Sequence, residues 1–208
     1  MEKVGSSNLP GSTNVCFMIK HPDQRVGMFV DVQNMYYSAK NLFDRHVNFG
    51  ALLKESVSER KLIRATAYTV KAQIPEEGSF FEALRGQGFE VKSKELQIFP
   101  GGVKKGDWDV GIAIDAIKLL SQLNVVVLVT GDGDFLPLVE YLQYHGLLVE
   151  LVAFKRTTSA KLLEKVDAFI DLEENARKFL MPKAASSAFR RRAERDDQGR
   201  RTSRRAQE

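Results

Sequence analysis

The sequence predicts an α/β domain built on a mainly parallel sheet with helices on both faces. Apolar segments of strand length alternate along the chain with segments of helical periodicity, which is the pattern of consecutive β-α units. Two strand segments, 26–30 and 125–129, are uninterrupted apolar runs, typical of strands buried on both faces. With 208 residues, 43% of them hydrophobic, the chain suffices for a single domain and its tails.

The first half of the chain predicts three strands and three helices. The first strand ends abruptly at Asp31. The third helix begins near Pro75, has an apolar face that includes Phe80 and Leu84, and ends at Gly86. The strands are expected at 26–30, 62–70 and 89–98, and the helices at 34–43, 49–57 and 75–86.

A Pro-Gly-Gly turn at 100–102 opens the second half. The helix expected at 107–123 carries apolar residues over most of its surface, so we expect it to be mostly buried. The run at 125–129 is the strongest strand signal in the chain, and a loop of Gly and Asp follows it. The remaining elements are helices at 135–145 (closed by Gly146), 157–165 and 173–180, and strands at 147–154 and 168–172.

The two ends of the chain differ in composition from the domain expected at 25–180. Residues 1–24 lack periodicity and predict a flexible leader, and residues 181–208 lack a hydrophobic face and predict a disordered tail. From Lys183 onward there are nine basic and four acidic side chains, so the preceding 182 residues of this +4 chain sum to −1. The basic tail either contacts nucleic acid through phosphates or serves only as a solubilising extension.

Several function classes are excluded by what the sequence lacks. Cys16 is the only cysteine, which rules out a disulfide framework and favours a reducing, cytoplasmic setting. No apolar run reaches the roughly 18 residues of a membrane span. There is no GxxxxGK[ST] or GxSxG motif, and Gln33 stands where an aspartyl-phosphate phosphatase needs a second Asp after Asp31. Three scattered histidines disfavour zinc.

Acidic residues follow two of the buried strands. Asp31 and Asp132 would lie outside the carboxyl ends of these strands, where open parallel sheets bind ligands. A single Asp at such a turn is often only a helix cap. Neighbouring carboxylates, however, destabilise a fold unless a cation neutralises them, and Mg²⁺ or Mn²⁺ suits such ligands. A metal there would activate water and stabilise charge on a phosphoryl oxygen, so a phosphodiester is the expected target.

Two further features flank this acidic group. Lys104 and Lys105 form either a solvated turn or a grip for substrate phosphate. Tyr36 and Tyr37 are the best candidates among the aromatic residues for the rim of a pocket, since the others have apolar surroundings typical of a core.

Three motifs, in this order, carry a resemblance to a known family. They are V-D-V-Q-N at 30–34, K-G-D-W-D-V at 105–110 and T-G-D-G-D-F at 130–135. The set resembles the NYN domain family, and within it the LabA-like branch, over residues 25–172. The resemblance implies a PIN-like, Rossmann-like fold and an Mg²⁺- or Mn²⁺-dependent ribonuclease site.

The metal-binding and catalytic set implied by the resemblance is Asp31, Asp109, Asp132 and Asp134. These residues would hold one or two metals and hydrolyse single-stranded RNA, with a role in the regulation of gene expression. The alternative is a non-catalytic regulator of the LabA-like type, which uses the same pocket to bind RNA or a nucleotide. Whether the protein forms a homo-oligomer stays open.

Other polar residues of the three motifs are expected around this set. Asn34, Lys105 and Thr130 would contact the substrate. Asp115 is a further acidic position on the central helix, and Asp107 is expected to be the cap of that helix.

Overall fold

A six-stranded, all-parallel sheet forms the centre of the computed structural model, which describes residues 20–71, 77–95, 97–98, 104–105 and 107–182. The strand order is β3-β2-β1-β6-β7-β8, which confirms the predicted class. The strands are β1 (Arg25–Asp31), β2 (Lys61–Lys71), β3 (Glu90–Glu95), β6 (Val125–Val129), β7 (Leu148–Ala153) and β8 (Ala168–Asp171).

Strands β1 and β6 lie at the middle of the sheet because neither has a polar face. All five residues of β6 are buried, and so are the five residues at 26–30 of β1. The two strands pair directly, from Val26 opposite Val125 to Val30 opposite Val129. Strands β2 and β3 continue the sheet on one side, and β7 and β8 continue it on the other. The strand order therefore reverses between β1 and β6, the place where open sheets bind ligands.

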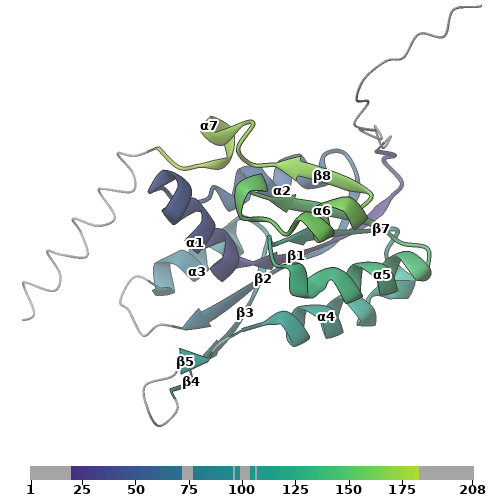
Figure 1. The fold of residues 1–208 in the computed structure, drawn as a ribbon, viewed down its shortest axis with the longest axis horizontal. Helices are drawn as coiled ribbons and strands as arrows, with labels where there is room; N and C mark the ends of the chain where they lie inside the picture. The colour runs from purple at the N-terminus through teal and green to yellow at the C-terminus, as the bar shows by residue number, and fades with distance from the viewer. Residues whose placement is uncertain (1–19, 72–76, 96, 99–103, 106, 183–208) are drawn as a thin grey trace, which may run out of the picture.

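Helices cover both faces of the sheet (Figure 1). Helices α1, α2, α3 and α7 pack against strand residues such as Met28 and Val127, and α4, α5 and α6 pack against residues such as Phe29 and Leu128. The alternation of side chains along each strand divides the interior into these two cores. The helices are α1 (Val32–Phe43), α2 (Phe49–Val57), α3 (Glu77–Gly86), α4 (Asp109–Lys118), α5 (Leu136–Tyr144), α6 (Ala160–Lys165) and α7 (Ala176–Phe179), with 3₁₀ turns η1 (Leu120–Gln122), η2 (Gly133–Phe135) and η3 (Lys155–Thr157).

The single strand expected at 89–98 is wrong. Strand β3 ends at Glu95, which pairs with Lys71, the last residue of β2, so the ladder stops where its partner strand stops. The short strand β4 (Gln97–Ile98) pairs instead with β5 (Lys104–Lys105), antiparallel to it and outside the main sheet. The expected turn at 100–102 lies outside the described residues.

Helix α4 is shorter and more exposed than expected. The helix expected at 107–123 ends at Lys118, and a 3₁₀ turn follows. Val110, Ile114 and Ile117 are 69%, 46% and 38% exposed, whereas Ile112 is buried. A helix on the outer face of a sheet buries only the side toward the strands, so the apolar residues on its other sides stay exposed. The helices expected at 157–165 and 173–180 are also shorter than expected, at Ala160–Lys165 and Ala176–Phe179.

A buried ion pair ties the α2–β2 connection to β7. The Arg60 guanidinium donates to both carboxylate oxygens of Glu150, at 2.6 and 2.9 Å, and both side chains are at most 2% exposed. Arg60 also donates to the backbone carbonyl of Val57 at 3.2 Å. The guanidinium is therefore matched by acceptors, which a buried charge requires.

The expected leader and basic tail lie almost wholly outside the described residues, which begin at Lys20 and end at Pro182. In the part of the chain that the structure describes, no helix has the length and apolarity needed to cross a bilayer.

Candidate metal centre

Asp31 lies at the carboxyl end of β1 and begins α1. It is the N-cap of this helix, and its Oδ1 accepts a hydrogen bond from the backbone N–H of Asn34 at 3.0 Å. The helix starts here because the apolar strand ends at a residue whose side chain satisfies a free N–H group of the first turn. The cap therefore fixes the Asp31 carboxylate at the carboxyl end of the central strands, beside β6.

The loop after β6 positions Asp132 in the same way. Thr130 is buried, and its hydroxyl oxygen accepts from the backbone N–H of Asp132 at 3.2 Å. Asp132 is the N-cap of η2, and its carboxylate accepts from the backbone N–H of Asp134 at 3.0 Å. Each hydroxyl or carboxylate along this loop thus satisfies an N–H group two residues further on.

The two glycines of this loop allow it to lie against the segment that follows β7. A Cβ atom on Gly131 would lie 2.7 Å from the carbonyl oxygen of Thr157, and one on Gly133 would lie 2.8 Å from the Ser159 hydroxyl. The Gly131 carbonyl accepts from the backbone N–H of Ser159 at 3.0 Å. The glycines are needed here because two backbones approach each other closely.

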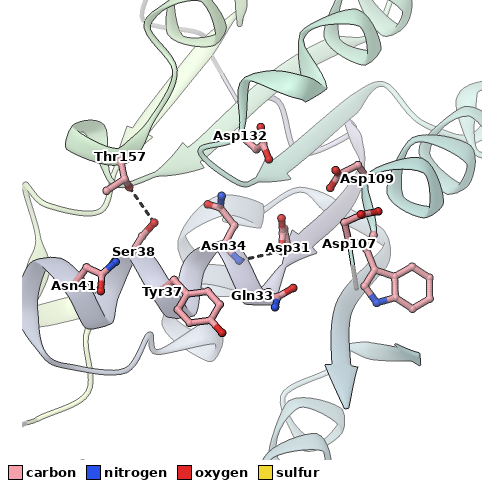
Figure 2. Close-up of a pocket in the computed structure, with 11 residues that line it drawn as sticks. Asp31, Gln33, Asn34, Tyr37, Ser38, Asn41, Asp107, Asp109, Asp132 and Thr157 are labelled. Atoms are coloured by element: carbon pink, nitrogen blue, oxygen red, sulfur yellow. Dashed lines mark hydrogen bonds between the residues drawn. The ribbon is translucent and has the colours of Figure 1, made fainter. Parts of the chain in front are cut away.

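Asn34 connects the two strand ends. Its side-chain oxygen accepts from the backbone N–H of Gly131 at 2.9 Å, so the first turn of α1 holds the loop that carries Asp132. The Asn34 amide and the Asp31 cap together join the ends of β1 and β6. Asp31 and Asp132 are consequently held on opposite sides of one pocket (Figure 2).

Asp109 completes the acidic group from α4. Oxygen atoms of Asp109, Asp132 and Asp134 lie within 4.8 Å of one another, close enough to share a single cation. The start of α4 is held by Trp108, whose indole N–H donates to the Thr69 carbonyl at 2.7 Å. The expected cap by Asp107 is wrong, since Trp108 occupies the N-cap position and makes no side-chain cap bond.

The pKa values of two of these carboxyl groups rise in the folded protein. Burial raises the pKa of Asp31 to about 6, and the negative charges of Asp109 and Asp132 add to this rise. The hydrogen bonds that the Asp31 carboxylate accepts from the backbone oppose it. Burial and the charges of Asp107, Asp132 and Asp134 also raise the pKa of Asp109. The charge of Lys94 opposes the rise at Asp109 but does not cancel it. The site therefore keeps a net negative charge, and its carboxylates offer only oxygen ligands. Such a donor set fits a hard divalent cation.

The pocket around these residues has a volume of about 410 Å³. Among the described residues that line it, every charged side chain is an aspartate. The acidic end adjoins a neutral wall along α1, and Figure 2 shows Asn34, Ser38 and Asn41 following one another along this helix. The lining residues are Asp31, Gln33, Asn34, Tyr37, Ser38, Asn41, Asp107, Trp108, Asp109, Asp132 and Thr157.

The structure brings most of the predicted metal residues together. Asp31, Asp109 and Asp132 line the pocket, and the exposed Asp134 joins two of them in the cluster of three carboxylates. Asp107, expected outside the site, also lines the pocket.

The predicted substrate residues have different positions. Asn34 lines the pocket, whereas Thr130 is buried beneath the loop and contacts Asp132 rather than open space. Lys105 lies in β5, and its side chain is outside the described part of the structure. Thr130 and Lys105 were both expected to contact the substrate. Thr130 can affect the substrate only indirectly, by holding the loop that carries Asp132.

Asp115 points away from the acidic group. It accepts hydrogen bonds from the Tyr68 hydroxyl at 2.9 Å and from Lys92 at 2.7 Å. Burial raises the pKa of Asp115, but the two hydrogen bonds together with the charges of Lys92 and Lys118 outweigh it and hold the pKa below its usual value. This carboxylate therefore joins α4 to β2 and β3 and has its charge compensated by protein groups.

Five pocket residues had no functional interpretation from the sequence. Gln33, Ser38 and Asn41 could have been found, because they recur with Asn34 and Tyr37 at the spacing of one helix face. Trp108 stands between two acids of the recognised motif. Thr157 comes from a segment 23 residues beyond Asp134, and no local pattern marks it.

Comparison with known proteins identifies a family for this chain and two relatives in sequence. The NYN domain family model matches residues 25–173. The chain is 27% identical to the Low amplitude and bright protein LabA of Synechococcus elongatus over 161 residues, which are 72% of this chain and 84% of that protein. It is 32% identical to the Uncharacterized protein MJ0482 of Methanocaldococcus jannaschii over 95 residues, 45% of this chain and 35% of that protein.

A solved structure also has this fold. It is the crystal structure of VPA0982, a protein of unknown function from Vibrio parahaemolyticus, with a TM-score of 0.71 and 33% identity. The match covers 79% of this chain and all of the other.

Proposed function

The chain belongs to the NYN domain family of the PIN-like nuclease superfamily, and on that premise we propose that it is a metal-dependent ribonuclease. It would hydrolyse phosphodiester bonds of single-stranded RNA with Mg²⁺ or Mn²⁺. The observation that carries this proposal is the cluster of Asp109, Asp132 and Asp134, with Asp31 across the pocket. The described lining of the pocket has no cationic side chain, and Lys94 outside it only partly offsets the charge at Asp109, so this group of carboxylates favours a bound cation.

The residues of the pocket would have different roles in such a site. Asp109, Asp132 and Asp134 would hold the cation, which when bound lowers the pKa of a water molecule and stabilises charge on a phosphoryl oxygen. Asp31, with its pKa near 6, would give up its proton as the cation enters at pH values below about 6, whereas at neutral pH it is already ionised and faces the cation as a carboxylate. Asn34 and Thr130 would act as positioning residues, because they hold the backbone on both sides of Gly131. A contact of Lys105 with substrate phosphate remains part of the proposal.

Cleavage of end-labelled single-stranded RNA tests the proposal. The wild type should cut in Mn²⁺ or Mg²⁺ and not in EDTA, and Asp132→Asn should lose cleavage by at least 100-fold, the size of effect seen when a charge-stabilising group is removed. Asp115→Asn is the matched control, since it removes an aspartate of the same region that lies outside the pocket. Equal cleavage by wild type and Asp132→Asn would sink the proposal.

The competing function is non-catalytic binding of RNA or a nucleotide by a regulator. One observation favours it: no Lys, Arg or His is among the described residues that line the pocket, so the described lining offers no cationic general acid. Retained metal-dependent affinity for RNA, without cleavage over a long incubation, would support this function.

The basic tail and the location of the protein complete the proposal. We infer that the tail contacts RNA phosphates and that the protein acts in the cytoplasm. A chain truncated after Leu180 should bind RNA more weakly and with a shallower dependence on salt, because each lost phosphate contact reduces the slope. Unchanged affinity and slope would remove the tail from the interaction. Sedimentation of the full chain would show whether a homo-oligomer forms.

A further inference from the structure

One face of α1 leads away from the acidic end of the pocket. Gln33, Tyr37 and Asn41 follow one another at intervals of four residues and all line the pocket. At a rise of 1.5 Å per residue this face extends over about 12 Å. Its side chains are two amides and an aromatic ring, none of which carries a charge. The pocket therefore has an acidic end and a neutral end.

The two ends suit different parts of one ligand. The aspartates repel a phosphate unless a cation lies between them, because the described lining has no positive side chain and Lys94, over the Trp108 ring, is outside that lining. The neutral end offers amide donors and acceptors beside a ring, which complement an uncharged planar group with donors and acceptors on its edge. A nucleotide has both parts, a charged phosphate and a neutral base, joined at a distance of a few ångströms.

Tyr37 supplies a surface for stacking. Its side chain is 55% exposed although it lines a pocket, and its ring meets the Tyr36 ring edge-on at 5.4 Å and 75°. An edge-to-face pair uses at most one face of either ring, so this contact leaves a face of the half-exposed Tyr37 ring for a ligand. Base–aromatic stacking needs one such free face and tolerates every base.

The amides beside this ring have unused hydrogen-bonding capacity. Within the described residues, neither the Gln33 nor the Asn41 side chain has a hydrogen-bond partner, and both reach the pocket. An amide presents a donor and an acceptor side by side, and an unpaired base presents the complementary pair on its edge. A base in a duplex hides that edge, so this arrangement selects a single strand.

The wall behind these groups is firmly held. The Thr157 hydroxyl donates to the Ser38 hydroxyl at 3.0 Å, which ties α1 to the segment after β7, as Figure 2 shows. Trp108, on the acidic side, is fixed by its bond to the Thr69 carbonyl. Because the residues on both sides of the pocket are fixed by hydrogen bonds, the pocket is preorganised and can bind a ligand without a conformational change.

We propose that the α1 face is a subsite for one unpaired nucleoside of the RNA, next to the phosphate held at the acidic end. Its base stacks on Tyr37, and its edge is read by the amides of Gln33 and Asn41. This subsite rests on the proposed function and adds to it the way in which the strand is recognised.

A scan with abasic RNA tests the subsite. A set of single-stranded oligonucleotides, each lacking one base, is offered to wild type and to Tyr37→Ala in Mn²⁺, and both cleavage and affinity (by fluorescence anisotropy) are measured. For the wild type, one abasic position should lower cleavage and affinity by roughly 5- to 100-fold, the loss of one base–aromatic stack. For Tyr37→Ala, the same abasic position should have little further effect, since the ring is already absent.

The controls separate the subsite from the reaction. Tyr144→Ala, which removes an 87% exposed tyrosine on α5, should behave like wild type. Gln33→Ala and Asn41→Ala should keep the stack but reduce differences among the four bases at that one position. If no abasic position couples to Tyr37, the subsite is overturned even where cleavage proceeds. If coupling appears in binding and no cleavage occurs, the subsite stands and the ribonuclease proposal fails.

Discussion

Replacing Asp31 with Asn should make the metal-free protein more stable at neutral pH. Asparagine caps a helix about as well as aspartate, so the bond to the Asn34 N–H can persist. The substitution removes the negative charge from a buried position that faces Asp109 and Asp132. What changes is therefore mainly the electrostatic free energy of the pocket, with shape and cap preserved.

The size of the effect follows from the pKa of Asp31. Its rise from 3.8 to about 6 means that the folded state binds this proton more tightly than the unfolded state does. Stability from this group is present below pH 3.8 and falls as the pH rises to about 6, since ionisation then opposes folding. At 1.36 kcal/mol per pKa unit, the ionised carboxylate costs about 3 kcal/mol at pH 7. Asp31→Asn avoids this cost, and for a domain of this size a difference of about 3 kcal/mol raises Tm by roughly 6–12 °C.

Urea unfolding in EDTA at several pH values measures this difference. The stability advantage of Asp31→Asn should be largest at pH 7 and should shrink as the pH falls from 6 toward 4. Asp115→Asn should show the opposite sign at pH 7, because the pKa of that carboxyl is held low by Lys92 and Tyr68. Added Mn²⁺ should stabilise wild type more than Asp31→Asn, because the variant keeps Asp109, Asp132 and Asp134 but lacks the fourth carboxylate. A variant no more stable than wild type at pH 7 would refute the electrostatic reasoning.

Three further substitutions probe the scaffold of the site. Arg60→Leu should lower the free energy of unfolding by about 3–5 kcal/mol, because it leaves the Glu150 carboxylate buried without its ion-pair partner. Changing both Arg60 and Glu150 to Leu should recover most of that loss. Urea unfolding of the two variants measures both effects. Gly131→Ala should cost about 1–3 kcal/mol and weaken Mn²⁺ binding in calorimetry, since its methyl group would meet the Thr157 carbonyl. Trp108→Phe should lower the free energy of unfolding by roughly 1 kcal/mol and weaken Mn²⁺ binding, because it removes the hydrogen bond that holds the start of α4. An unchanged Mn²⁺ affinity in Gly131→Ala or in Trp108→Phe would contradict the positioning role of that residue.

The central strands and the acids that follow them could be predicted because their signals are local. The runs at 26–30 and 125–129 have no polar face, so burial on both sides was the one way to satisfy them. The carboxyl ends of parallel strands meet at one edge, so the sequence alone predicts that Asp31 and Asp132 lie together.

The parts that could not be predicted depend on partners distant in the chain. The strand expected at 89–98 was divided because its neighbour β2 ends at Lys71, a fact that the 89–98 segment does not contain. Asp107 was expected to be a cap, yet the indole bond from Trp108 to Thr69 sets where α4 begins. Thr157 lies beside the pocket because Gly131 lets the loop after β6 approach its backbone closely. In each case a tertiary contact decided what local preference left open.

The cap and the metal ligand are compatible roles for Asp31 and Asp132. A carboxylate offers about four acceptor sites, and a helix cap uses one of them. The cap bond also favours the ionised form: at Asp31 the Asn34 N–H opposes the rise in pKa that burial causes. A capped aspartate at the end of a buried strand is thus held in place, kept nearer to the charged state and left with free oxygen lone pairs. These are the properties that a cation requires of a ligand, so the helix start contributes to building the site. The same reasoning predicts that Asp132→Ser, which can still cap η2 but carries no charge, keeps the fold and loses Mn²⁺ binding.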